Sequence, residues 1–580
     1  MAIKARHLRR NNNPLLAIKL PPLRSQIVML ILAMAFMSLA ARAAYLQVMR
    51  GDYLQKEGGK RYERAIDLPA SRGRIVDRNG SVLAASLPAH AVWAIPDQID
   101  APPEKLRALA KLLELPERDM ARKLADEDRS FVYLKRQVDA DVAAKIAALG
   151  ISGIHQRNEY KRHYPEGETL AHVVGFTNVE DVGLEGIELS QQKQLGGLPG
   201  MRRVVKDGRG RIIEDLQAIR EPRDGRDVSL SIDTRIQYLV HSALKDAVRA
   251  NRAKAGAAVV LDAQSGEVLA LSNWPSYNPN QRSKMNAAQI RNRALTDVFE
   301  PGSTMKPFTA ALALDSGRYS AKSVIQTGPG RLVIGADSIG DAHALGPLTV
   351  EQVIQKSSNI GTAKMALSMS SREMWDMFIA LGFGQSPDLG FPGAVAGRVR
   401  PYKKWKPIEQ ATMSYGHGVS VSLLQMARAY TVFARDGELI PVTMFKPDRP
   451  AIGTMVMKPQ TAQAVRRMLE LAAGPEGTAP QAQVEGYRVA GKTGTSRKQE
   501  NGQYVKKYVS SFVGMAPASN PRVIVAVMID EPSNGKYYAG EVAAPVFSRI
   551  TGDSLRALRV NPDAPMVTLV MPSKGVDESF

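Results

Sequence analysis

The chain has 580 residues, with 77 Lys and Arg against 57 Asp and Glu, which gives a formal charge of +20. An apolar content of 44% excludes a disordered chain, and the length favours several domains of about 100–200 residues each. The absence of cysteine excludes disulfides, thiolate metal ligands and cysteine nucleophiles. The eight histidines show no close metal-ligand spacing, so we predict no metal and no cofactor.

The first predicted element is an apolar helix that spans a membrane, at residues 25–45. No charge lies between Arg24 and Arg42, and about 20 apolar residues cross a bilayer. A cleaved signal peptide is the alternative, but Ala41-Arg42-Ala43 is a poor cleavage site. Six basic and no acidic residues precede the apolar run, so we predict that residues 1–24 are a cytoplasmic tail and that the rest faces the bacterial envelope.

Residues 46–220 are predicted to form a mixed α+β domain without a catalytic cluster. Helical periodicity occurs at 103–115 and 139–149, between short polar turns. Charged residues flank several glycines, and we interpret these groups as structural turns. Their members are Arg72, Gly73, Asp77, Arg162, Gly183 and Glu188.

Residues 221–557 are predicted to form an α+β domain. Residues 228–232 have a strand pattern, and Asp233 is a plausible cap for the helix that follows. Two hairpins are predicted, at 257–272 and at 510–529, with helical texture between them. We expect one antiparallel sheet built from both ends of the domain, with an inserted helical region. The tail at 558–580 carries no functional signal.

A serine followed three residues later by lysine can place a hydroxyl beside an amine, which suits covalent acyl transfer. The pattern occurs four times, so it is weak alone; the pairs are Ser190/Lys193, Ser242/Lys245, Ser303/Lys306 and Ser533/Lys536. Ser303 alone follows a Glu-Pro-Gly turn, and Pro307 is best accommodated if residues 303–307 form the first turn of a helix. A helix N-terminus favours developing negative charge, so we select Ser303.

Two further motifs complete the candidate site. Ser357-x-Asn359 follows a predicted helix at 349–356, and Lys-Thr-Gly occurs once, at Lys492–Gly494, on a strand-like stretch that starts at residue 487. A second hydroxyl can relay a proton to a leaving amine, and a lysine with threonines on an edge strand can hold a carboxylate.

The order of these three motifs resembles that of the penicillin-recognising serine acyltransferases. The strings at 291–307, 355–360 and 490–495 look like those of the division-specific class B penicillin-binding proteins. The glycine turns before residue 190 also resemble the class B N-terminal motifs, so the resemblance covers about residues 20–557. It implies a pedestal or dimerisation-type domain at 46–220 and a transpeptidase domain at 221–557, whose antiparallel sheet would carry helices on both faces.

The resemblance implies a serine-type D-Ala-D-Ala transpeptidase that crosslinks peptidoglycan stem peptides and is a target of β-lactams, which bind covalently at Ser303. Ser303 would be the nucleophile and Lys306 the base, with a pKa lowered by desolvation and by Lys492. Ser357 and Lys492 would shuttle the proton. The remaining implied roles are orientation by Asn359, substrate binding by Thr493, Gly494 and Thr495, in which the two threonines meet the terminal carboxylate, and an oxyanion hole from the N–H groups of Ser303 and Thr495.

The resemblance also implies the cellular setting. The chain would sit in the inner membrane at the division septum, with its catalytic domain in the periplasm. Because no glycosyltransferase segment is apparent, it would depend on the membrane-embedded division glycosyltransferase and other division proteins. His417 stands where relatives often have another residue, and it either lines the pocket or fills space.

Other functions fit the sequence less well. A β-lactamase would not normally carry an anchor and a pedestal, and 24 residues before the anchor are too few for the signalling region of a penicillin sensor. An elongation-specific class B protein is the closest competitor. A nucleic-acid binder would explain the raw charge, but no groove-reading motif appears.

Overall fold

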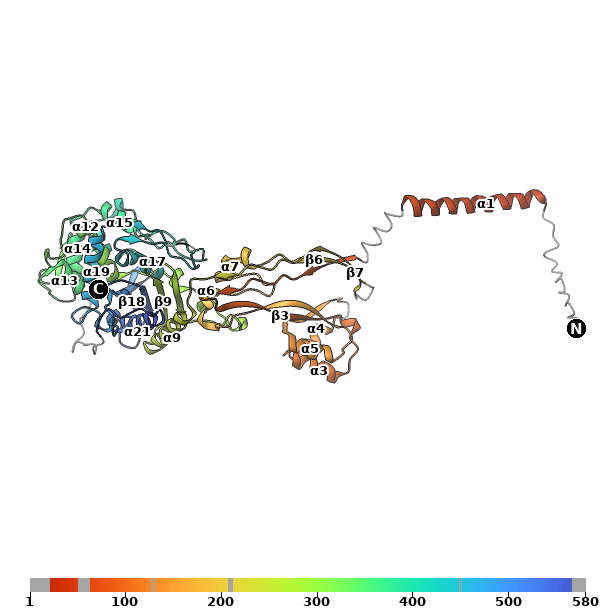
Figure 1. The fold of residues 1–580 in the computed structure, drawn as a ribbon, viewed down its shortest axis with the longest axis horizontal. Helices are drawn as coiled ribbons and strands as arrows, with labels where there is room; N and C mark the ends of the chain where they lie inside the picture. Colours follow the sequence, from red (N-terminus) through yellow and green to blue (C-terminus); the bar gives the residue numbers. More distant parts are fainter. Residues whose placement is uncertain are drawn as a thin grey trace. The chain divides into compact units, whose positions relative to one another are not determined.

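The computed structural model describes residues 21–50, 63–126, 129, 131–206, 212–447, 449 and 451–565. These residues form two compact units (Figure 1). Unit 1 comprises the described residues up to Leu68 together with Pro199–Pro222, and unit 2 comprises Pro69–Leu198 and the chain from Arg223 onward. Of the predicted N-terminal and C-terminal tails, residues 1–20 and 566–580 lie outside the described part.

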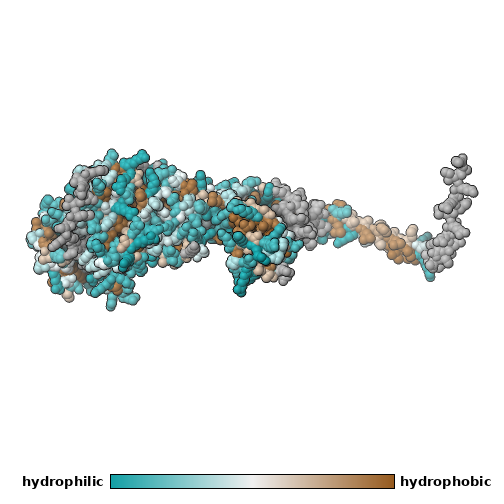
Figure 2. All heavy atoms as spheres, turned by 90° about the horizontal axis from the view of Figure 1, so that it is seen from below, coloured by the Kyte–Doolittle hydropathy of each residue, from teal (hydrophilic) through white to brown (hydrophobic). Residues whose placement is uncertain are grey.

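Unit 1 contains the predicted apolar helix. Helix α1 runs from Pro22 to Ala44 and continues as a π-helical turn, η2, from Tyr45 to Met49. Within these 28 residues, the most apolar window has a mean hydropathy of 2.1, and no residue of that window is buried against the rest of the protein. Figure 2 shows the helix as a largely brown, hydrophobic rod. A three-stranded antiparallel sheet completes the unit, in the order β1 (Glu63–Leu68), β6 (Gly200–Lys206) and β7 (Ile212–Arg220).

The N-terminal part of unit 2 is built on a five-stranded sheet, which we call the β3 sheet. Its strands are β2 (Ile75–Val76), β3 (Val82–Ala94), β4 (Val132–Asp139), β5 (Ile154–His163) and β8 (Val228–Ser229). Apolar side chains of β3 and β4 form a common core with those of three helices, α3 (Pro103–Leu112), α4 (Glu117–Leu124) and α5 (Ala140–Ala148). The helices predicted at 103–115 and 139–149 are therefore present but shorter. The strand predicted at 228–232 is mostly wrong, because only its first two residues join the sheet. Three short helices follow, α6 (Ala171–Val174), α7 (Gly186–Ser190) and α8 (Gln192–Leu195).

The predicted antiparallel sheet built from both ends of the C-terminal domain, which we call the two-ended sheet, is confirmed. The order is β10–β9–β19–β18–β17, all antiparallel, so strands from residues 255–274 pair with strands from residues 490–530. Both predicted hairpins are present, and Asp233 caps the helix that precedes the sheet, with its carboxylate accepting from the Arg235 N–H. The bounds are β9 (Ala255–Asp262), β10 (Val268–Trp274), β17 (Ala490–Glu500), β18 (Gln503–Ala516) and β19 (Val523–Asp530).

Side chains that alternate along the strands bury both faces of this sheet. Ala258 and Val260 of β9 pack with α9 (Thr234–Ala250) and α21 (Ala544–Ala557), whereas Val259 packs into a second core that includes α12 (Lys306–Asp315) and α17 (Leu423–Ala429). Helices therefore cover both faces, which confirms the predicted α+β fold class.

The inserted helical region lies between β10 and β17. Besides α12 and α17 it contains α10 (Ala287–Ile290), α11 (Arg293–Thr296), α13 (Val350–Gln355), α14 (Asn359–Leu367), α15 (Ser371–Ala380), α16 (Pro407–Met413), α18 (Thr431–Ala434) and α19 (Pro459–Ala473). Three two-stranded ribbons accompany them, β11 (Val324–Gln326) with β14 (Pro347–Thr349), β12 (Arg331–Ile334) with β13 (Asp337–Gly340), and β15 (Glu438–Leu439) with β16 (Thr454–Met455). A short helix, α20 (Ala539–Val542), leads into α21.

Candidate active site

Ser303 lies in a tight turn that leads directly into a buried helix. Residues Gly302–Met305 form a 3-10 turn, and α12 begins at Lys306 with Pro307 in its first turn. The structure thus differs from the predicted α-helical first turn only in that Ser303 lies in the tighter helix that precedes α12. Ser303 remains partly exposed whereas Lys306 is fully buried, so the turn presents a hydroxyl to solvent and hides the amine behind it.

Glycine allows the Lys-Thr-Gly strand to lie against this turn. A Cβ at Gly494 would stand 2.5 Å from the Pro301 carbonyl oxygen and 2.9 Å from the Thr304 methyl group. A Cβ at Gly416 would stand 2.3 Å from the carbonyl oxygen of Gly302, in the same turn. Any side chain at either position would push its segment away from the turn that carries Ser303. The glycines therefore set how closely the three segments approach.

The amine of Lys306 reaches the second motif. Its Nζ donates to the carbonyl oxygen of Ser357 and lies 3.1 Å from the Ser357 hydroxyl. Ser357 sits between α13 and α14 with φ of 60°, in the left-handed region that costs a non-glycine residue about 1–2 kcal/mol. The fold therefore holds Ser357 in a strained conformation where its hydroxyl meets a buried amine.

Asp341 fixes the start of α14, a role that the sequence did not indicate. Its carboxylate accepts from the Ser358 hydroxyl at 2.6 Å, from the Asn359 N–H at 2.6 Å and from the Ile360 N–H at 3.1 Å. A carboxylate at a helix N-terminus satisfies otherwise unpaired N–H groups. Asn359 also donates through its side chain to the Gly340 carbonyl at 3.1 Å. The loop before α14 is thus tied down by Gly340 and Asp341.

The third motif lies at the start of β17, which begins at Ala490 rather than at the predicted residue 487. Lys492 is fully buried, and its Nζ lies 3.1 Å from the Thr493 hydroxyl, which in turn lies 3.0 Å from the hydroxyl of Thr478. The Thr495 hydroxyl accepts from the Ala539 N–H at 3.0 Å. Thr478 was not predicted, because a single threonine in a Gly-rich loop carries no pattern.

His417 lies beside the site and has a depressed pKa. Its ring centroid is 5.2 Å from that of Tyr415 and 6.2 Å from that of Tyr504, a residue of the β17–β18 hairpin. Burial, followed by the positive charges of Lys306 and Arg497, lowers the pKa of His417 to about 4, so the imidazole is neutral at pH 7. The Glu300 carboxylate connects the residues on either side of His417, because it accepts hydrogen bonds from the Gly418 N–H and the Tyr504 hydroxyl, at 2.8 and 2.9 Å.

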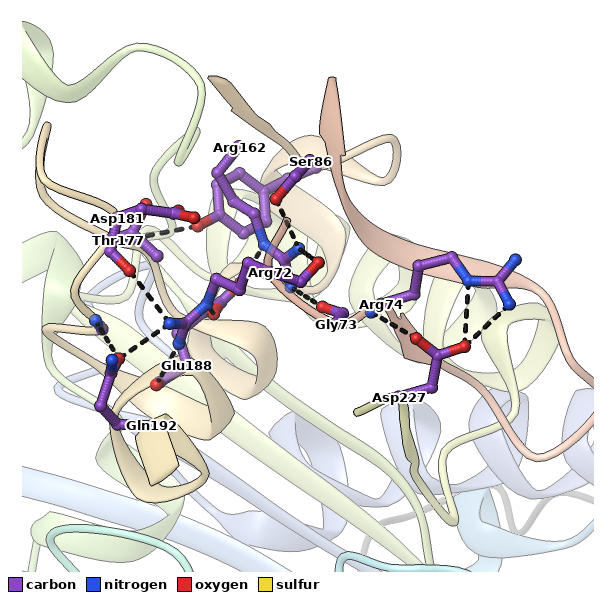
Figure 3. Close-up of polar contacts among 12 residues, drawn as sticks. Arg72, Gly73, Arg74, Ser86, Arg162, Thr177, Asp181, Glu188, Gln192 and Asp227 are labelled. Carbon is purple, nitrogen blue, oxygen red and sulfur yellow. Dashed lines mark hydrogen bonds and ion pairs between the residues drawn. The ribbon is translucent and has the colours of Figure 1, made fainter. Parts of the chain in front are cut away.

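The charged residues near the N-terminal glycines form a separate buried cluster (Figure 3), the arginine cluster of Arg72, Arg162 and Glu188. Glu188 binds both guanidinium groups, and Arg162 also donates to the Gly73 carbonyl at 2.8 Å. All three side chains are at most 2% exposed. Gly183 is required beside them, because a Cβ there would stand 2.0 Å from the Glu188 carbonyl oxygen. These contacts connect the segment that precedes β2 with β5 and α7.

Asp77 organises the turn that precedes β3. One carboxylate oxygen accepts from the N–H groups of Asn79 and Ser81, both at 2.8 Å, and the other accepts from the Thr234 hydroxyl at 2.9 Å. Burial alone would raise the pKa of Asp77, but these hydrogen bonds outweigh it and lower the pKa. The carboxylate thus ties the N-terminal part of unit 2 to the start of α9.

Comparison with known proteins matches two families along the chain. Residues 256–552 match the penicillin binding protein transpeptidase domain, and residues 67–230 match the penicillin-binding protein dimerisation domain. The chain is 43% identical over 548 residues to the probable peptidoglycan D,D-transpeptidase PenA of Neisseria meningitidis, covering 94% of each chain. It is 42% identical over 542 residues to the peptidoglycan D,D-transpeptidase FtsI of Escherichia coli K12, covering 92% of this chain and 91% of that one.

A solved structure resembles the C-terminal part. The transpeptidase domain of penicillin-binding protein 3 from Burkholderia pseudomallei is 55% identical and superposes with a TM-score of 0.54, over 58% of this chain and 98% of that one. The similarity therefore includes the region that carries all three motifs.

Proposed function

The chain belongs to the penicillin-binding proteins that carry a dimerisation domain and a transpeptidase domain, and on this premise we propose that it is a peptidoglycan D,D-transpeptidase of cell division. The contact that best supports this activity is the one between Lys306 and Ser357, because it joins two motifs 51 residues apart in the sequence at one buried amine. The close approach of Gly494 to Pro301 adds the third motif.

In the first half-reaction, Ser303 attacks the carbonyl carbon between the two terminal D-alanines of a stem peptide. Lys306 accepts the hydroxyl proton, which a buried amine can do because removal from water disfavours its charged form. The N–H groups of Ser303 and Thr495 stabilise the oxyanion. Ser357 and Lys492 pass the proton to the leaving D-alanine amine, and an acyl-enzyme remains.

In the second half-reaction, the amine of a neighbouring stem attacks the acyl-enzyme and closes the crosslink. Before acylation, Lys492, Thr493, Gly494 and Thr495 bind the donor stem beside the nucleophile, with the threonine hydroxyls directed to the terminal carboxylate, which departs with the released D-alanine. Asn359 orients Lys306 and the substrate amide. The proton from the incoming amine returns along the same path to Ser303, which leaves the enzyme ready for another cycle.

The same premise supports a setting at the inner membrane. Among the described residues, one helix is long and apolar enough to span a membrane, and its place near the N-terminus fits a single-pass anchor. We infer that the N-terminus is cytoplasmic, that the catalytic domain is periplasmic at the septum, and that the partners are the division glycosyltransferase and other division proteins. β-Lactams are expected to acylate Ser303 as substrate analogues.

Labelling with a fluorescent penicillin tests the chemistry. The full chain is expected to form a long-lived adduct that Ser303→Ala abolishes. Ser242→Ala is a matched control, because Ser242 and Lys245 show the same spacing within α9. Lys306→Ala is expected to slow acylation by about 10²–10⁴-fold. Rapid release of the label would indicate a β-lactamase, and acylation at the normal rate in Lys306→Ala would exclude Lys306 as the base.

Depletion in cells tests the division role. Filamentous cells are expected if the chain works at the septum, whereas rounded cells would assign it to elongation instead.

A further inference from the structure

A hollow of about 580 Å³ lies in unit 2, within the region that matches the dimerisation domain and outside the transpeptidase match. Two chain segments form it, one that includes α8 and the residues after it and one that leads into β8. Its lining residues are Lys193, Gln194, Gly197, Leu198, Arg223, Asp224, Gly225 and Arg226. The catalytic mechanism uses none of them.

The backbone of the hollow is rigidly built. Leu198 and Arg223 exchange two backbone hydrogen bonds, at 2.7 and 2.9 Å. A Cβ at Gly225 would stand 1.8 Å from the Leu195 carbonyl oxygen, and one at Gly197 would stand 2.8 Å from the Arg223 carbonyl oxygen. The two segments therefore approach to backbone contact, and the hollow is a fixed feature of their crossing.

The charges that line the hollow are predominantly positive. Lys193, Arg223 and Arg226 are exposed, and none of them makes a side-chain hydrogen bond or ion pair with another residue in the part of the chain that the structure describes. The one carboxylate, that of Asp224, accepts the Ser71 N–H at 2.7 Å. The lining therefore has a formal charge of +2.

This clustering does not serve the fold. Like charges that share a small volume repel one another, and no described carboxylate forms an ion pair with any of these three. Nearby Arg74, by contrast, is paired with Asp227 at 2.8 Å. Two guanidinium groups and an ammonium in a concave site suit a ligand that carries several carboxylates, because arginine binds carboxylate in a bidentate geometry. A hollow of this size also lies within the range of small-ligand sites, which is about 300–1,000 Å³.

We propose that this hollow is a second, non-catalytic binding site for the carboxylates of peptidoglycan stem peptides. The proposal rests on the proposed function, since it takes as ligand the same polymer that the active site crosslinks. Stem peptides carry several carboxylates within a few residues, which matches a compact cationic site better than a flat basic surface would. A strand held here by one stem presents its other stems to the chain at a raised effective concentration.

The site therefore affects polymer binding and leaves acylation chemistry unchanged. Uncrosslinked glycan strands with their stems are expected to bind more tightly than single disaccharide-peptides, and their affinity is expected to fall with added salt. A β-lactam, which needs only the active site, is expected to react at the same rate whether the hollow is charged or neutral.

The test measures binding of soluble uncrosslinked glycan strands to the full chain in detergent, in a Ser303→Ala background that prevents turnover. The triple variant Lys193→Gln, Arg223→Gln, Arg226→Gln is expected to bind the strands at least tenfold more weakly and with a shallower salt dependence. A matched triple variant removes three exposed cations from α3 and α4 of the same unit, Arg107→Gln, Lys111→Gln and Arg118→Gln, and is expected to bind as the parent does. Strands whose carboxyl groups have been amidated are expected to bind the parent as weakly as native strands bind the first triple variant.

Two further readouts separate this proposal from the catalytic one. With Ser303 present, the first triple variant is expected to react with fluorescent penicillin at the parent rate and to unfold at the same temperature or slightly above it. Strand affinity equal to that of the parent, or an equal loss in the matched control, would overturn the second site. Absence of a penicillin adduct in the parent chain would instead contradict the proposed function and leave the strand-binding result interpretable.

Discussion

Replacing Glu188 with Gln is expected to destabilise the N-terminal part of unit 2 by about 3–5 kcal/mol. Glu188 is the anion that both Arg72 and Arg162 share, at contacts where all three side chains are at most 2% exposed. Removing one partner of a buried ion pair leaves an uncompensated charge, which costs about 3–5 kcal/mol. Because two guanidinium groups depend on the same carboxylate, we expect the upper end of that range.

Denaturant unfolding followed by fluorescence measures the loss. Trp93 lies in β3 and its ring stacks on that of His155 at 4.4 Å, so its emission reports on the β3 sheet. A chain in which the other tryptophans are changed to phenylalanine isolates this signal. Glu180→Gln is the matched control, because the ion pair between Glu180 and Arg136 is partly exposed and such pairs contribute about 0–1 kcal/mol. A loss below about 1 kcal/mol in Glu188→Gln would refute the view that both guanidinium groups depend on this carboxylate.

Three other predictions concern the transpeptidase domain and its junction with the β3 sheet. Gly494→Ala is expected to slow penicillin acylation by about 10²-fold, because the new methyl group displaces β17 from Pro301. The control Gly474→Ala, whose methyl group makes only ordinary van der Waals contacts, is expected to leave the rate unchanged, and equal rates in both variants would contradict this. Ser357→Gly is expected to keep or slightly raise the melting temperature, because glycine adopts a φ of 60° without strain, and to slow acylation by at least about 10²-fold, because the hydroxyl of the proposed proton relay is lost. A large drop in melting temperature would contradict the view that Ser357 is strained. Burial, with smaller contributions from neighbouring groups, lowers the pKa of His172 from 6.5 to about 4, so the unfolded chain binds a proton at this residue more readily than the folded chain does. As pH falls from 6.5 to 4, the parent is therefore expected to lose up to about 3 kcal/mol of unfolding free energy relative to His172→Gln, and a difference that stays constant with pH would contradict this.

The parts of the fold that the sequence predicts are those with a strong local signal. The strands of both hairpins are continuous apolar runs bounded by turn residues, and these runs identified β9, β10, β18 and β19. The β3 sheet was missed because β5 carries no such signal. Its residues 154–163 are largely polar and half exposed, since the strand pairs with β3 along one edge and buries little side-chain surface.

The candidate site shows the same division. The lysine and serine motifs are recognisable because their spacing encodes chemistry, and the structure brings Lys306 and Ser357 into contact. Asp341 and Thr478 could not be predicted, because each acts through a tertiary contact with a residue far along the chain and neither belongs to a pattern. The arginine cluster lies between these cases. The sequence predicts that Arg72, Arg162 and Glu188 are structural residues, but only the packing shows that Glu188 pairs with both arginines.

The two-ended sheet has a consequence for biosynthesis. Asp262 of β9 pairs with Val523 of β19, so about 260 residues must be made after β9 before its partner exists. At about 5–20 residues per second, translation of that stretch takes roughly 13–50 s. During this time β9, whose residues are all buried in the finished sheet, lacks one neighbour and is exposed to misassembly with other chains. Lys492 and Gly494 are also made late in this interval, so a nascent or truncated chain carries Ser303, the proposed nucleophile, without the strand that lies against its turn. The order of synthesis thus delays acyl transfer until nearly the whole polypeptide has left the ribosome.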